Sequence, residues 1–273
     1  MNCGTLLRFA GASVIALALA ACNGDGTGTS TDLTLEESTD AAQTVGDAVS
    51  EDVGQWFEGE GTMGAGGVGP SVMAEGALAL GDQCPFNAST GRFVCPPVVR
   101  EGITINRSFA LLDAQNQSMQ AFDPQLTASA NFQWSAQGTV ARDNWTGTVN
   151  RQRDMTVTGM AGLETRRTWN GEGSNHIEAT FTGGAGTRSY THDVQSKVDD
   201  VVVAVPRALN NPWPLSGTFT AHVTSNRPRF GGGTVDFTAV VTFNGTRFVP
   251  LDVGDRQFCL DLALRRLSQL NCR

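Results

Sequence analysis

Ser174 and His176 are the residues whose types and spacing come closest to a catalytic pair. Two positions apart on a strand, their side chains would project from the same face, where a histidine can accept the proton of a serine nucleophile. Asp193 and Glu172 are the carboxylates available to orient the imidazole. The apolar residues of 177–181 alternate with polar ones and predict that the pair lies on the wetted face. We therefore interpret Ser174 and His176 as exposed strand residues and expect no enzyme; a hydrolase using them is an alternative.

Two other groups are suited to binding. A run of three glycines follows Arg227, Arg229 and Phe230. This pattern predicts a basic loop with an aromatic tip, which could bind an anionic glycan or a lipid headgroup. Trp213, between two prolines, is the tryptophan we expect to act as a binding aromatic. The alternative for the loop is an ordinary solvated hairpin. His192 alternates with apolar neighbours, and we expect it to be half-buried with its polar groups satisfied.

Four cysteines follow the first eighty residues, at Cys84, Cys95, Cys259 and Cys272. An even number in an exported chain indicates disulfides, and of the three pairings we favour the two local ones, Cys84–Cys95 and Cys259–Cys272. A zinc site is the competing interpretation, but the chain has no C-x-x-C pair and no histidine near these cysteines. We expect no metal site and no cofactor.

The chain from residue 71 to 273 has the pattern of an all-β domain. Between residues 126 and 140 apolar and polar residues alternate with a period of two, as on a sheet with one buried face, and the same signature recurs up to residue 264. Asn170-Gly171 and Asn244-Gly245 are typical of two-residue hairpin turns. We predict an antiparallel meander of roughly ten to twelve strands (a curled sheet, sandwich or barrel-like form) with one N-terminal amphipathic helix.

That helix is predicted over residues 34–58. Thr34 and Glu37 have the spacing of a capping box, apolar residues recur with helical spacing, and Gly59 is a candidate stop. Residues 59–70 are rich in glycine and predict a linker. Both G-x-G-x-x-G matches fall in this linker, away from the strand–helix context that dinucleotide binding requires.

Charge is divided unevenly along the chain. Residues 22–82 contain twelve acidic residues and no lysine or arginine, whereas residues 83–273 contain fifteen acidic and eighteen basic residues. The net charge of −8 therefore belongs to the N-terminal arm, and the β domain is nearly neutral. We expect no nucleic-acid partner, because no basic stripe with interleaved aromatics is present.

The N-terminus has the features of an export signal. Residues 9–21 form an apolar run without charge, of the length of a signal-peptide core and too short to cross a bilayer. The run ends in Leu19-Ala20-Ala21-Cys22, which resembles the lipobox of bacterial lipoproteins. The resemblance implies that residues 1–21 are removed and that Cys22 carries palmitate and related acyl chains. Residues 22–33 would then form a lipidated flexible tether in the bilayer. Asn23, where an aspartate would resemble an inner-membrane retention signal, indicates the outer membrane.

These features predict a cell-envelope lipoprotein whose β domain has a non-enzymatic binding or scaffolding role. Its partners, besides the bilayer reached through Cys22, would be a glycan, a lipid or an envelope protein. The alternative is a carrier of lipid or another hydrophobic ligand in the periplasm, because a large one-faced sheet can curl around an apolar molecule.

Overall fold

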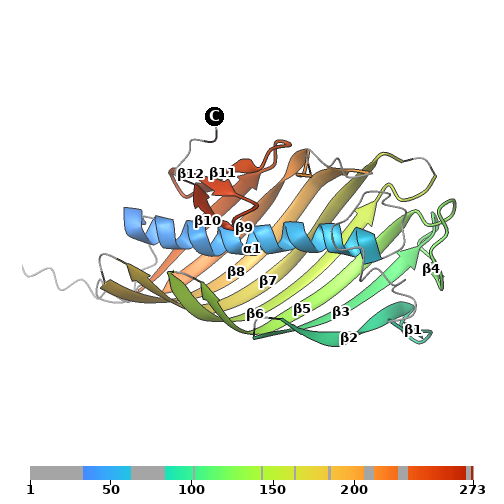
Figure 1. The fold of residues 1–273 in the computed structure, drawn as a ribbon, viewed down its shortest axis with the longest axis horizontal. Helices are drawn as coiled ribbons and strands as arrows, with labels where there is room; N and C mark the ends of the chain where they lie inside the picture. The colour runs from blue at the N-terminus through green and yellow to red at the C-terminus, as the bar shows by residue number, and fades with distance from the viewer. Residues whose placement is uncertain are drawn as a thin grey trace, which may run out of the picture.

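The computed structural model describes residues 33–62, 84–100, 102–142, 144–162, 164–183, 186–205, 212–226, 233–268 and 272. Within these ranges the chain forms one long helix, α1, and a single antiparallel sheet of thirteen strands. The helix lies lengthwise across one face of the sheet (Figure 1). The predicted all-β meander with one N-terminal helix is confirmed, with one strand more than the upper end of the expected range.

The strands neighbour one another in chain order, except that β4 pairs with β3 alone, so that β5 follows β3 in the sheet. Most connections are short, which favours antiparallel neighbours. The strands are β1 (Phe86–Asn87), β2 (Arg92–Arg100), β3 (Ile103–Leu112), β4 (Ser118–Met119), β5 (Ser129–Arg142), β6 (Trp145–Thr158), β7 (Arg166–Gly183), β8 (Gly186–Ala204), β9 (Ser216–Asn226), β10 (Thr234–Thr242), β11 (Phe248–Val253), β12 (Arg256–Asp261) and β13 (Arg266–Ser268).

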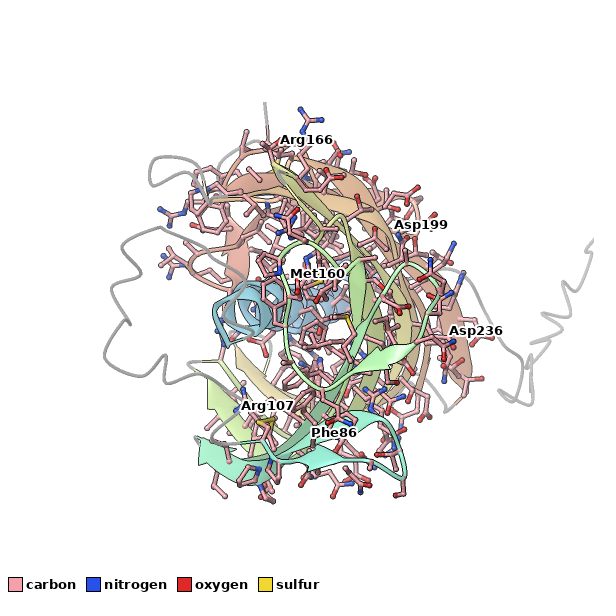
Figure 2. The ribbon with its side chains drawn as sticks, turned by 90° about the vertical axis from the view of Figure 1, so that its right-hand side faces the viewer. Phe86, Arg107, Met160, Arg166, Asp199 and Asp236 are labelled. Carbon is pink, nitrogen blue, oxygen red and sulfur yellow. A yellow bond between two sulfur atoms is a disulfide. The ribbon has the colours of Figure 1, made fainter. Side chains whose placement is uncertain are left out.

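The sheet bends around α1 without closing on itself, as Figure 2 shows with the helix seen nearly end-on. We call the face toward α1 the inner face and the opposite face the outer face. The two end strands, β1 and β13, contain only two and three residues.

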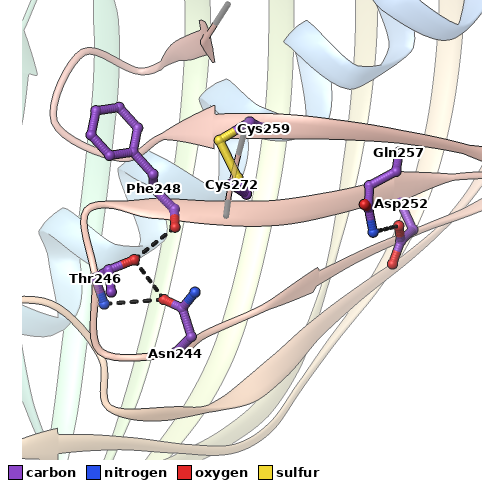
Figure 3. Close-up of a disulfide and its surroundings, with 7 residues drawn as sticks. All are labelled: Asn244, Thr246, Phe248, Asp252, Gln257, Cys259 and Cys272. Carbon is purple, nitrogen blue, oxygen red and sulfur yellow. Dashed lines mark hydrogen bonds between the residues drawn. A yellow bond between two sulfur atoms is a disulfide. The ribbon is translucent and has the colours of Figure 1, made fainter. Parts of the chain in front are cut away.

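Both ends of the sheet are also tied by a disulfide. Cys95 on β2 is bonded to Cys84, which precedes β1, and Cys259 on β12 is bonded to Cys272, which follows β13 (Figure 3). The two local pairings predicted from the sequence are therefore confirmed. Each closes a short loop, with separations of 11 and 13 residues, and so restricts the unfolded chain.

Helix α1 spans Leu35–Thr62 and begins with the predicted capping box. The Glu37 amide donates to Thr34 Oγ1 at 3.2 Å, and the Thr34 amide donates to Glu37 Oε2 at 2.8 Å. The helix continues four residues past the predicted end at residue 58. A glycine inside a helix costs only about 1 kcal/mol relative to alanine, so Gly59 weakens the helix without ending it.

The core lies between α1 and the inner face. Ala42, Val45, Val49 and Val53 are buried there, with apolar side chains from both halves of the sheet. A second buried cluster, around Ile177, covers the inner face of β3 and of β5 to β8. On β5 the predicted alternation is confirmed. Its inward residues are buried or half-buried; they are Ala130, Phe132, Trp134 and Ala136. Of the outward residues, Gln133 is exposed, Asn131 and Ser135 are half-buried, and Ser129 at the start of the strand is buried.

The hairpin turn predicted at Asn170-Gly171 is wrong, because both residues lie inside β7. Gly171 faces the inner side, and a Cβ there would clash with the backbone of Asp154 and the side chain of Met155. The glycine thus permits close packing, at a place where β8 has a bulge opposite Asn170. Asn244-Gly245 does lie between β10 and β11, but in a connection of five residues and not in the predicted two-residue turn. The Asn244 side chain accepts two hydrogen bonds from Thr246 there (Figure 3).

Nearly all the described side chains of α1 between residues 40 and 53 are buried, and three of them are carboxylates. Asp52 pairs with Arg153 of β6 at 3.0 Å, and their side chains are 3% and 1% exposed. Asp40 pairs with Arg188 of β8 at 2.8 Å, and hydrogen bonding to Asp40 raises the pKa of Arg188. Two acidic groups of the helix are thereby neutralised by arginines of the inner face.

Replacing Asp52 by alanine should reduce the free energy of unfolding by about 3–5 kcal/mol, because Arg153 would stay buried after losing the Asp52 carboxylate. The exposed Lys197–Asp199 pair offers a matched control: Asp199→Ala should cost no more than about 1 kcal/mol. Urea unfolding of the two variants measures the difference. Equal, small shifts would show that the Asp52–Arg153 pair is not buried as described.

Candidate binding site on the outer face

An open trough crosses the outer face of the sheet. It runs over seven neighbouring strands, from β2 to β9, and has a volume of about 1160 Å³. Neighbouring strands lie about 4.8 Å apart, so the trough is about 29 Å long. Asp199 and Asp236 project from this side of the molecule, away from α1 (Figure 2).

The strand register arranges the trough side chains in two rows that run across the strands. Successive outward residues of one strand are about 6.8 Å apart, which sets the distance between the rows. One, the charged row, consists of Gln133, Asp154, Glu172 and Lys197. The other, the alternating row, consists of Asn106, Ser135, Gln152, Ser174, Gln195 and His222.

One end of the trough is held by a chain of hydrogen bonds across four strands. Arg92 donates to Ser108 Oγ at 3.0 Å and to Asn131 Oδ1 at 2.8 Å. The Asn131 amide donates to Asp154 Oδ1 at 2.6 Å, and Gln133 donates to Asp154 Oδ2 at 2.8 Å. Burial lowers the pKa of Arg92, and the nearby Asp154 opposes that shift. These mutual contacts hold the side chains in place before a ligand arrives.

The remaining trough groups are suited to hydrogen bonding with a polar ligand. Carboxamides donate and accept hydrogen bonds at once, and hydroxyls do the same. Lys197 and Glu172 face each other across β7 and β8, so opposite charges adjoin. Among the described residues no group of histidine, cysteine or carboxylate side chains could hold a metal ion.

Of the predicted catalytic pair, Ser174 lines the trough and His176 lies beside it, both on the outer face. His176 is exposed, and its Nδ1 lies 2.7 Å from Asp193 Oδ1. In the part of the chain that the structure describes, no hydrogen bond joins Ser174 to His176. The histidine thus has the predicted carboxylate beside it but does not contact the serine.

Of the other predicted binding residues, Trp213 is the one that the structure describes, and it does not line the trough. Trp213 is half-buried and packs against the main core. Cys22 and the loop residues Arg227, Arg229 and Phe230 lie outside the described residues. The trough itself was missed because its residues are far apart in the sequence, and outward polar residues on single strands do not reveal the register that aligns them.

His192 was predicted to be half-buried with its polar groups satisfied, and the structure differs on both points. The side chain is fully buried under α1, and neither ring nitrogen has a hydrogen-bond partner. Its ring stacks on Tyr190 at 5.5 Å, and burial lowers the pKa of His192 to about 4. Proximity to Asp40 and Asp193 offsets part of that effect. The imidazole is therefore neutral in the folded protein at neutral pH.

The buried imidazole should make the protein less stable in mild acid. Above pH 6.5 both states carry a neutral histidine; between pH 6.5 and about 4 the unfolded chain binds a proton that the folded protein does not. The free energy of unfolding should fall by about 3 kcal/mol over that window, at 1.36 kcal/mol per pH unit. Urea unfolding at several pH values should show that His192→Phe removes this loss, whereas His176→Phe retains it. Parallel pH profiles for His192→Phe and the unmodified protein would contradict the assignment.

Comparison with known proteins finds no family model that matches the chain, no similar curated protein and no similar solved structure. Among the described residues, no helix is both long and apolar enough to span a membrane.

Proposed function

We propose that this protein is a lipid-anchored component of the cell envelope that binds a glycan in the trough on its outer face. The observation that carries the proposal is the trough itself, about 1160 Å³ in volume, to which five of its seven strands contribute carboxamide or hydroxyl side chains. A glycan offers many hydroxyl groups that donate and accept hydrogen bonds, which complements such a lining. Charges of both signs adjoin there, so the lining does not select strongly for an anionic or a cationic ligand.

Two features argue against the alternatives. A hydrophobic-ligand carrier needs access to the apolar inner face, but α1 packs along that face with its own apolar residues. A lipid would have to displace the helix and separate its carboxylates from Arg153 and Arg188. A hydrolase centred on Ser174 and His176 needs a hydrogen bond between them, which the structure does not contain.

The anchor part of the proposal rests on the lipobox-like residues 19–22. The acidic charges of residues 22–82 would be repelled by an anionic membrane, which would hold the β domain away from the lipid surface. A binding face on such a domain can reach polymers that lie beyond the headgroups.

Glycan binding can be tested by sedimentation. The full chain in detergent micelles should sediment with at least one insoluble envelope glycan or structural polysaccharide. A variant with Gln152→Ala and Gln195→Ala should lose about tenfold in affinity, the equivalent of about 1.4 kcal/mol of hydrogen bonding. The control Gln137→Ala changes an outward glutamine of β5 that does not line the trough. No sedimentation with any polysaccharide, or equal loss in both variants, would overturn the proposal.

The anchor can be tested by metabolic labelling with a palmitate analogue in a bacterial host. The unmodified chain should be labelled and should partition with membranes, whereas Cys22→Ser should be unlabelled, because the variant lacks the thiol that is acylated. Equal labelling of both proteins would contradict attachment at Cys22.

A further inference from the structure

From β3 to β8 the side chains of the alternating row change type with a period of two strands, and His222 on β9 ends the alternation. Across β3, β5, β6, β7 and β8 its members are an amide, a hydroxyl, an amide, a hydroxyl and an amide. The amides are exposed and the two serines are half-buried. Ser135 therefore lies in a slot between Asn106 and Gln152, and Ser174 lies in a second slot between Gln152 and Gln195.

The two slots lie about 9.6 Å apart, because two strand spacings separate them. A sugar chain that crosses the strands with one ring per strand would place every second ring in a slot. In a β-1,4-linked chain successive rings are flipped by about half a turn, so rings of the same orientation recur with this period and this approximate length. An α-1,4-linked chain curls and does not present equivalent rings in that way.

We infer that the alternating row binds a β-1,4-linked glycan that lies across the strands, with two rings of the same orientation over Ser135 and Ser174. The inference rests on the proposed function and specifies the linkage and the direction of the chain. Exposed Gln152 stands between the two slots and reaches both rings, and the Asn106 amide already donates to Ser135 Oγ at 3.4 Å. Hydroxyl and amide groups that meet each ring can donate and accept hydrogen bonds.

Chain length supplies a direct test, because a disaccharide can occupy one slot and a trisaccharide reaches both. In calorimetric titrations of the full chain in detergent micelles, cello- or chito-oligosaccharides should gain most affinity, about tenfold or more, from two rings to three. Maltotriose should show no such gain over maltose. Equal increments at every added ring, equal binding of maltotriose, or failure of both β-1,4-linked series would overturn the inference.

Filling one slot tests the position. Ser174→Gln should weaken trisaccharide binding about tenfold and leave disaccharide binding within about twofold, since one slot stays open. Ser216→Gln changes an exposed serine of β9 outside the trough and should leave both unchanged. If Ser174→Gln weakened disaccharide binding as much as trisaccharide binding, the two slots could not be separate. If the protein still sediments with insoluble glycans in a way that depends on Gln152 and Gln195 while these tests fail, the inference is wrong and the proposed function stands. If the protein binds no glycan, both are wrong.

Discussion

The fold depends on the neutralisation of an acidic helix by arginines inside a curled sheet. An unclosed sheet leaves its inner face exposed to water unless another element covers it, and α1 does so along the middle of the groove. The apolar residues of the helix supply the hydrophobic part of that contact. Its carboxylates Asp40 and Asp52 are buried as well, at a desolvation cost that close partners offset. Arg153 and Arg188 are those partners, from β6 and β8.

The same arrangement constrains the inner face. Arg153 lies between Asp52 and the ring of Trp134, at 5.8 Å from the ring centroid, and it needs room beside its strand. That room comes from Gly173 on β7, where any Cβ would clash with the Arg153 side chain. The Arg153–Asp52 pair thus depends on the absence of a side chain at position 173. Because α1 occupies the inner face, the outer face is the surface of the sheet left for binding.

The sequence predicts those parts of the fold that local patterns control. Alternation specified the strands, and the Thr34–Glu37 spacing specified the start of the helix. Cysteine spacing specified both disulfides. Prediction from the sequence failed where contacts between distant segments decide the structure. Asn170-Gly171 has the residue types of a hairpin turn, yet it lies in a strand because Gly171 packs against β6.

The candidate site illustrates the same limit. Each residue of the alternating row is an ordinary outward polar residue of its own strand, and the pattern exists only across strands. A register shift by one residue would turn every such side chain to the inner face. Local patterns also gave no sign that His192 lies under the helix, since its burial comes from α1, which is distant in the sequence.

Hydrogen exchange measured by mass spectrometry on the full chain, with and without a bound glycan, tests the central claim most directly. If α1 stays packed on the inner face and the ligand binds on the outer face, the backbone amides of residues 40–53 should exchange as slowly as those of β7 and β8. Their rates should not change when the glycan binds, while protection should rise in the trough strands. Rapid exchange of α1 in the free protein, or a change in its exchange on binding, would contradict the account.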